Sequence, residues 1–249
     1  MSVRTATKSD ARYSSELLEV VRWTGRLGAV TAEAMAHHQQ RPLASARALL
    51  LSGERAGLVR RSRVLANAPT LYAVTGAGLR AAGLRGLEPS RVSVANAPHA
   101  IASAAAAAAL ERAYPDHEVM GERELRREER ETGHALASAP IRVGGDGALH
   151  RPDLVLWPTG SGGALPVAVE VELTAKSPRR LLEICRAWAR CRCVAGALYL
   201  TAAEVRRPLA RAIDAAQAHE RVVAVALDAL LAGETSSQPA PACTVPSET

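Results

Sequence analysis

The spacing of apolar residues changes at Gly57, and this change constrains the fold more than any other feature of the sequence. Three stretches before Gly57 have the 3.6-residue spacing of amphipathic helices, and in the third the predicted buried stripe is Leu43, Ala46, Leu49 and Leu50. After Gly57 apolar residues alternate, as in strands. The predicted elements are helices at 16–23, 31–39 and 43–56, strands at 58–65 and 70–75 around a turn at 67–69, and a helix at 75–82.

This order of elements is that of a winged helix-turn-helix domain, an α+β fold, which we assign to residues 14–90. The second helix of that motif enters the DNA major groove, and nearby cations bind phosphates. The segments GLVRR and TLYAVTGAGLRAAGL also resemble the wing and following helix of bacterial winged helix regulators. The alternative is an ordinary solvated arginine surface. The expected contacts to double-stranded DNA are Arg41, Ser45 and Arg47 at the third helix, and Arg60, Arg61 and Arg63 on the wing.

The basic charge of the chain is concentrated in its first part. Residues 1–98 hold 14 Lys and Arg against 6 Asp and Glu, whereas residues 99–249 hold 17 against 19. The alternative explanation is a GC-rich genome, which would enrich arginine in both parts of the chain. It explains the high total arginine content better than the uneven distribution of charge between the two parts. The asymmetry favours a polyanion held by the N-terminal domain.

The ends of the chain and one internal segment lack apolar periodicity. We expect disordered tails at residues 1–13 and 233–249, and a linker at 91–98. The segment MSVRTATKSD has no apolar stretch behind its basic residues, and the sequence has no apolar run of membrane-spanning length, so we expect neither a secretory leader nor a membrane-spanning helix. The four cysteines Cys185, Cys191, Cys193 and Cys243 cluster late in the chain and form no disulfide framework. These features predict a cytoplasmic protein without a membrane partner.

Residues 99–232 alternate helical and strand patterns, which predicts a second, α/β domain with a central mixed sheet. The alanine-rich segment at its start is a helix by propensity alone. The predicted helices are 99–114, 178–190 and 206–219, and the predicted strands are 118–121, 141–143, 149–157, 166–173, 195–200 and 222–227.

Three carboxylates in this domain are candidates for a metal site. Strand alternation places Glu170 and Glu172 on one face of a strand, and a neighbouring strand carrying Asp153 would bring a third carboxylate beside them. Mg²⁺ or Mn²⁺ prefers oxygen ligands of this kind and retains waters that can attack a phosphodiester. The alternative is that Glu170 and Glu172 form an ordinary polar strand face.

The Pro152-Asp153 pair and the later Glu170-Val171-Glu172 triplet resemble the motif of the PD-(D/E)XK nuclease superfamily. A winged helix before such a domain resembles the plasmid replication-relaxation family. The resemblance implies that Asp153 and Glu170 hold metal and that Glu172 binds metal or orients water. The sequence departs from the motif because glutamate occupies the lysine position. Lys176 is a candidate replacement, provided that the chain turns back before Pro178.

The remaining candidates favour structural roles. Cys185, Cys191 and Cys193 lack a second paired motif for metal, so we expect buried thiols. His150, next to the acidic residues, is a candidate phosphate contact. Three functions therefore remain: a metal-dependent DNA nuclease or nickase of a mobile element, a transcriptional regulator, and a replication accessory protein. In the last two the second domain is inactive and serves for homodimer formation or partner binding.

Overall fold

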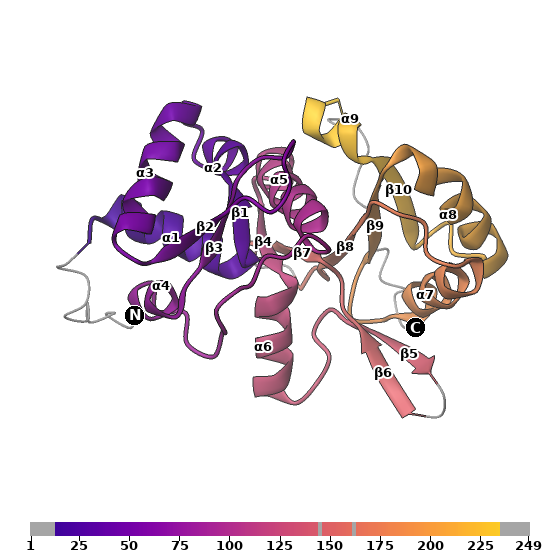
Figure 1. Ribbon diagram of the computed structural model, residues 1–249. Helices are drawn as coiled ribbons and strands as arrows, with labels where there is room; N and C mark the ends of the chain where they lie inside the picture. Colours follow the sequence, from indigo (N-terminus) through magenta and orange to yellow (C-terminus); the bar gives the residue numbers. More distant parts are fainter. Residues whose placement is uncertain (1–12, 144–145, 161–162, 235–249) are drawn as a thin grey trace. The chain divides into compact units, whose positions relative to one another are not determined.

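The computed structural model describes residues 13–143, 146–160 and 163–234 (Figure 1). The predicted tails, including Cys243, lie almost entirely outside these residues. The chain divides into two compact units, Met1–Ala105 and Ala106–Thr249. The division falls inside helix α5 (Ala97–Ala113), which begins within the segment that the sequence indicates as a linker.

The N-terminal unit contains the predicted series of helices and hairpin around a three-stranded antiparallel sheet of order β1-β3-β2. Strand β1 was not predicted, because three buried residues between two helices are too short to show an alternating pattern. The elements are α1 (Ser15–Leu27), β1 (Ala29–Thr31), α2 (Ala32–His38), α3 (Leu43–Arg55), β2 (Val59–Ser62), β3 (Leu71–Val74) and α4 (Gly76–Ala81).

Hydroxyl side chains cap three helices of this unit. The side chains of Ser14, Thr31 and Thr75 accept hydrogen bonds from backbone amides in the first turns of α1, α2 and α4. The hydroxyl of Thr75 also donates to the carbonyl of Gly57 at 2.6 Å, which ties α4 to the turn after α3. Side-chain capping therefore fixes where each of these helices begins.

The buried stripe of α3 is narrower than the sequence indicates. Ala46 and Leu50 are fully buried, but Leu43 is 39% exposed, so its assignment to the core was wrong. Leu43 is the first residue of the helix, directly after Pro42, and lies at the end of the stripe. Packing is close between α4 and the turn before β2, where a Cβ on Gly78 would lie 2.1 Å from the carbonyl oxygen of Leu58.

The C-terminal unit is built on a five-stranded mixed sheet of order β10-β9-β8-β7-β4. Strands β8, β9 and β10 run parallel, whereas β7 pairs antiparallel with both β8 and β4. A separate hairpin joins β5 and β6. The elements after α5 are β4 (His117–Gly121), α6 (Glu122–Thr132), β5 (Ala139–Val143), β6 (Asp146–His150), β7 (Leu154–Pro158), β8 (Val167–Glu172), α7 (Pro178–Arg190), β9 (Gly196–Thr201), α8 (Ala203–Ala216), β10 (Val222–Ala226) and α9 (Leu227–Ala232).

The single strand predicted at 149–157 was wrong, because the chain turns a corner there. Strand β6 ends at His150 and β7 begins at Leu154 in a different sheet. Pro152 between them has no amide hydrogen for a strand ladder. The carbonyl of Asp153 instead accepts the amide of Glu122 at 2.9 Å, at the start of α6.

Helix α6 was missed because its sequence, ERELRREERET, has almost no apolar residues. It is anchored by Leu125, which is fully buried, and by Glu129. One carboxylate oxygen of Glu129 accepts the backbone amide of Leu136 at 3.0 Å, and the other accepts the Nε of Arg151 at 3.0 Å. Helix α6 is thus held to the protein by the hydrogen bonds of a buried carboxylate and by one buried leucine, where an amphipathic helix would use an apolar stripe.

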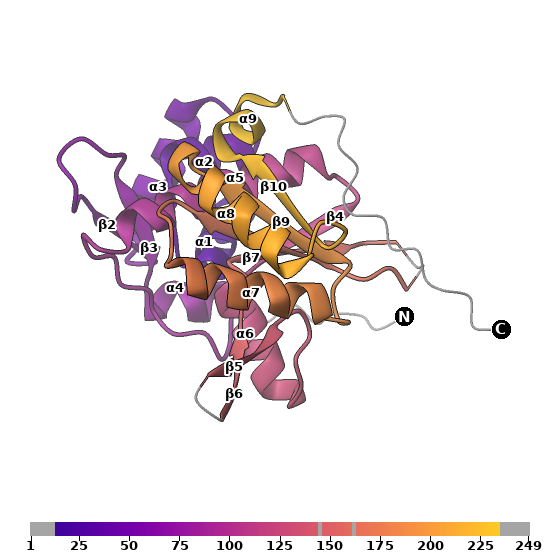
Figure 2. The same ribbon diagram turned by 90° about the vertical axis from the view of Figure 1, so that its right-hand side faces the viewer.

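Helices α7 and α8 lie side by side over one face of the five-stranded sheet (Figure 2). Their buried residues, among them Leu181, Trp188 and Leu209, form one core with Ala168 of β8 and Tyr199 of β9. Every residue of β8 is buried. The face that carries Glu170 and Glu172 is therefore a core face, and not the polar face that the alternation in sequence indicates.

Candidate functional site

The exposed face of α3 carries the predicted polar residues. Ser45 and Arg47 are exposed, together with Ala44 and Ala48 beside them. The guanidinium of Arg41, just before α3, lies 2.9 Å from a carboxylate oxygen of Glu16 on α1. Arg41 therefore has an intramolecular partner at the surface, and the hydrogen bond and charge of Glu16 raise its pKa.

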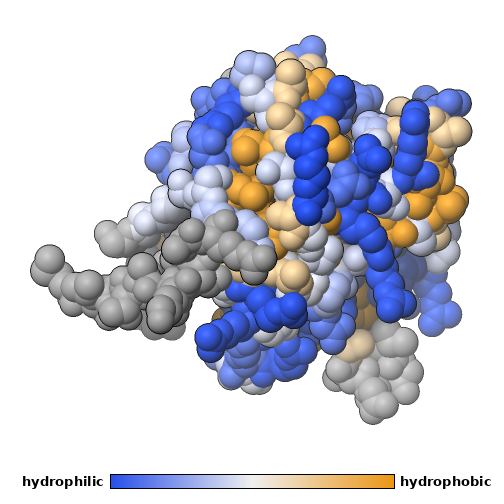
Figure 3. Space-filling model, turned by 60° about the vertical axis from the view of Figure 1, so that its left-hand side comes forward, coloured by the Kyte–Doolittle hydropathy of each residue, from blue (hydrophilic) through white to orange (hydrophobic). Residues whose placement is uncertain are grey.

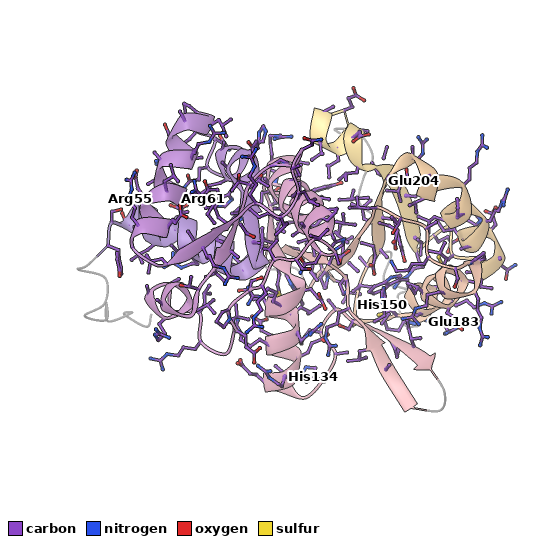
Figure 4. The ribbon with its side chains drawn as sticks, viewed as in Figure 1. Arg55, Arg61, His134, His150, Glu183 and Glu204 are labelled. Atoms are coloured by element: carbon purple, nitrogen blue, oxygen red, sulfur yellow. The ribbon has the colours of Figure 1, made fainter. Side chains whose placement is uncertain are left out.

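The strand register separates two of the predicted wing arginines. Arg61 is opposite Tyr72 and Arg60 is opposite Ala73, so their side chains lie on opposite faces of the sheet. Arg61 lies toward α3 and its Nε is 3.4 Å from Glu54 of that helix (Figure 4). Arg63 follows β2 and is exposed. The predicted wing set is thus not one surface.

Arg47 and Arg61 come together at a pocket of about 200 Å³ between α3 and the β2–β3 sheet. The guanidinium of Arg47 is 3.9 Å from the carboxylate of Glu33, and both arginine side chains are 55% exposed. Ion pairs at such distances and exposures are weak. The lining consists of Ala32, Glu33, Arg47, Leu51, Arg61, Thr70 and Tyr72.

Long hydrophilic side chains stand between apolar patches on the face turned forward in the space-filling view (Figure 3). Within the described residues, Arg60 and Arg63 form no ion pair with an acidic side chain. Arg47, Arg60, Arg61 and Arg63 are therefore exposed, and those of them that have acidic partners are weakly paired.

The three predicted acidic residues do lie near one another. Strand β7 pairs with β8 so that Leu154 is opposite Val169, and this places Asp153 beside Glu170. The carboxylate of Asp153 accepts the amide of Val171 at 2.7 Å. Each carboxylate of the group, however, is bonded to other groups of the protein.

Glu170 is held in the core by two ring nitrogens. Its Oε1 accepts the indole N–H of Trp188 on α7 at 3.2 Å and lies 2.6 Å from Nε2 of His150. The rings of His150 and Trp188 meet edge to face, with centroids 5.6 Å apart. Glu170 has a side chain only 5% exposed. Burial raises the pKa of Glu170, while the hydrogen bond and charge of His150 act in the opposite direction.

The chain turns back after β8, which is the condition for Lys176 to reach the acidic residues. Its ammonium group forms an ion pair with the carboxylate of Glu172. The turn is fixed by Ser177, whose side chain accepts the amide of Arg180 and caps α7. Lys176 therefore reaches the acidic group, although it lies four residues beyond the lysine position of the motif.

The described residues contain no group of three or more His, Cys, Asp or Glu side chains arranged to hold a metal ion. The reason lies in the partners of each carboxylate. Oε1 of Glu170 faces two ring nitrogens, a carboxylate oxygen of Asp153 accepts a strand amide, and Glu172 is neutralised by Lys176. In this arrangement the carboxylates do not fit Mg²⁺ or Mn²⁺, which needs converging oxygen ligands.

Sequence reasoning missed the part of Trp188. Trp188 is a core residue of α7, and helical spacing alone says nothing about which strand residue its indole N–H contacts. His150 was expected to be free for a phosphate and is instead bonded to Glu170. His150 ends β6, Glu170 lies on β8 and Trp188 lies on α7, so these side chains come together only in the tertiary fold.

The structure thus defines a mixed α/β protein with a small N-terminal antiparallel sheet and a five-stranded mixed sheet. No family model and no curated protein matches the chain. Among solved structures it is similar to the crystal structure of protein VC1899 from Vibrio cholerae, with 10% sequence identity and a TM-score of 0.36 over 90% of this chain. The chain spans 56% of that protein's length.

Within residues 13–143, 146–160 and 163–234, none of the helices combines the length and the apolar character needed to cross a bilayer.

Proposed function

We propose that the chain is a cytoplasmic protein that binds double-stranded DNA through its N-terminal unit, acting as a winged helix-turn-helix. One observation carries the proposal: Arg47 from α3 and Arg61 from β2 line the same pocket. In a winged helix-turn-helix the recognition helix enters the major groove, so cations on this helix and on the neighbouring wing can contact the phosphate backbone beside that groove.

The electrostatics support this assignment. Arg47 and Arg61 are exposed, and their carboxylate partners lie at 3.9 and 3.4 Å, at the long end of ion-pair distances. Exposed pairs of this kind contribute about 0–1 kcal/mol. Phosphate oxygens offer bidentate, charge-assisted bonds to guanidinium groups, so DNA is a stronger partner than Glu33 or Glu54.

The acidic group of the C-terminal unit does not carry a second, enzymatic proposal. Metal-dependent cleavage would need Asp153, Glu170 and Glu172 to exchange their present partners for a cation, at the cost of an unpaired indole N–H in the core. We therefore favour the regulator or replication accessory protein over the nuclease.

The test is DNA binding by the full chain with matched arginine variants. Arg61→Ala and Arg47→Ala should each weaken binding of a short duplex by roughly tenfold, or about 1.4 kcal/mol. The slope of log affinity against log salt should fall by about one for each phosphate that the variant no longer neutralises.

Arg60→Ala is the control, because Arg60 lies on the same strand, carries the same charge and faces the opposite side of the sheet. It should weaken binding less than Arg61→Ala. Equal losses in the two variants would mean that DNA responds only to net charge, and the assignment of this pocket to DNA would be withdrawn.

A further inference from the structure

Two cysteines lie in contact at the end of α7. The Sγ atoms of Cys191 and Cys193 are 3.1 Å apart. Cys191 is the C-cap residue directly after α7, and only Arg192 separates it from Cys193. The proposed DNA-binding function uses neither residue.

The two sulfur atoms differ in access. Cys191 is 2% exposed and belongs to the core beneath α7, whereas Cys193 is only partly buried at its edge. Both lie near the buried carbonyl of Ser138, at 3.9 Å for Cys191 and 3.6 Å for Cys193. A reagent from solvent would therefore meet Cys193 first, with Cys191 directly behind it.

The backbone around the pair is fixed. The amide of Cys191 donates to the carbonyl of Trp188 at 3.2 Å, within the last turn of α7. The guanidinium of Arg221 donates to the carbonyl of Cys191 and, at 2.8 Å, to that of Val194. These bonds hold both sides of the Cys-Arg-Cys segment, so the thiols are already close without a change of fold.

We propose that Cys191 and Cys193 form a redox-active dithiol that is oxidised to an intramolecular disulfide by small disulfide molecules of the glutathione class. Cys193 is the attacking residue and Cys191 the resolving residue. The described residues offer no third ligand that would convert the pair into a metal site.

The reaction proceeds in two exchanges. The thiolate of Cys193 attacks one sulfur of oxidised glutathione, which breaks the S–S bond of the oxidant and releases one glutathione thiolate. The thiolate of Cys191 then attacks Sγ of Cys193 and releases the second. The two cysteines lose two electrons, the oxidant gains them, and the two protons leave with the released glutathione thiols.

The two thiols share a hydrogen bond that acts on them in opposite directions. It lowers the pKa of Cys191 to about 7 and, together with burial, raises the pKa of Cys193. Once Cys193 is part of the mixed disulfide it no longer donates this hydrogen bond, and Arg221 is then the group that favours the Cys191 thiolate. The order of attack therefore rests on access, because solvent reaches Cys193 first.

The test uses the full chain carrying Cys243→Ser, since Cys243 lies outside the described residues and could otherwise pair with a released thiol. The protein is equilibrated in graded mixtures of reduced and oxidised glutathione, acid-quenched, alkylated and analysed by mass spectrometry. We expect a product that has lost two hydrogens and resists alkylation at Cys191 and Cys193. Cys185→Ser should leave this product unchanged.

Single variants separate the two roles. Cys191→Ala should accumulate a mixed disulfide with glutathione at Cys193, because the resolving thiol is gone. Cys193→Ser should leave Cys191 largely reduced, because the accessible thiol is gone. A thermal melt of each variant shows whether its fold is retained, and the wild-type experiment tests the proposal if either variant does not fold.

The urea-unfolded chain supplies the reference for the folded geometry. The equilibrium constant for disulfide formation should be at least about tenfold greater in the folded protein than in the unfolded chain. This ratio corresponds to a difference of about 30 mV in the reduction potential of this two-electron couple. The proposal is overturned if the folded chain stays reduced under conditions that oxidise the unfolded one, or if a mixed disulfide persists at Cys193 while Cys191 is present.

Discussion

The two units differ in the burial and pairing of their candidate functional side chains. In the N-terminal unit Arg47 and Arg61 are more than half exposed and weakly paired, whereas in the C-terminal unit Glu170 is buried with hydrogen-bonding partners. An exposed, weakly paired side chain loses little free energy when it exchanges its partner for a ligand. A buried side chain with hydrogen-bonding partners loses much more when those partners are removed. This contrast favours ligand binding in the first unit and structural stabilisation in the acidic group of the second.

The largest effect should come from removing the buried carboxylate. Glu170→Ala leaves the indole N–H of Trp188 and the ring of His150 without their shared partner and opens a cavity beside them. We expect a loss of about 3–5 kcal/mol in the free energy of unfolding, measured by urea denaturation. A loss below about 1 kcal/mol would break the comparison, because the acidic group would then not be structural.

Glu170→Gln is the matched control and adds a dependence on pH. Because burial raises the folded-state pKa of Glu170 above its ordinary value of 4.5, this carboxyl stabilises the fold most at pH below 4.5, and the contribution is lost as pH rises through the folded-state value. The charged groups that act on it are His150, Asp153 and Lys176. Stability relative to the glutamine variant should therefore fall as pH rises above 4.5.

The next effect tests whether packing rather than charge maintains the N-terminal unit. Gly78→Ala would place a Cβ 2.1 Å from the carbonyl oxygen of Leu58, and a backbone atom cannot move aside cheaply. We expect a loss of about 1–3 kcal/mol by urea denaturation. Gly76→Ala, two residues earlier in the same helix, meets nothing closer than 3.4 Å and should be neutral or slightly stabilising.

The sequence predicted most elements because their signals are local. Apolar periodicity identified the helices of the N-terminal unit, and the change at Gly57 located the hairpin. Helix α6 was not predicted, because its stability depends on the contacts of Glu129 with residues outside the helix. Strand β1 is too short for periodicity to detect.

The candidate sites were predictable in their residues but not in their pairings. Pro152 and Asp153 stood out in sequence, but nothing local shows that β6 ends before them and that Asp153 caps the amide of Val171. Alternation placed Glu170 and Glu172 on one face, yet α7 covers that face and supplies Trp188. Similarly, consecutive arginines at 60 and 61 indicate one basic wing until the register separates them.

A smaller effect should follow from neutralising the acidic partners of the DNA-facing arginines. Glu33→Gln and Glu54→Gln each remove an exposed ion pair, so the free energy of unfolding should change by less than about 0.5 kcal/mol. DNA affinity should rise about two- to fivefold at low salt, because Arg47 or Arg61 no longer exchanges a carboxylate for a phosphate. Weaker binding by both variants would show that these glutamates position the arginines rather than compete for them.

The smallest effect is expected from divalent cations, and it tests the buried side of the comparison. A cation that bound Asp153, Glu170 and Glu172 in the native state would raise the melting temperature. Since these carboxylates already have protein partners, millimolar Mg²⁺ or Mn²⁺ should leave the melting temperature unchanged, and Asp153→Ala should respond as the wild type does. A rise in the wild type that Asp153→Ala abolishes would show that the carboxylates exchange partners for metal. Cleavage of supercoiled plasmid with Mn²⁺, lost in the same variant, would then favour the nuclease over the regulator.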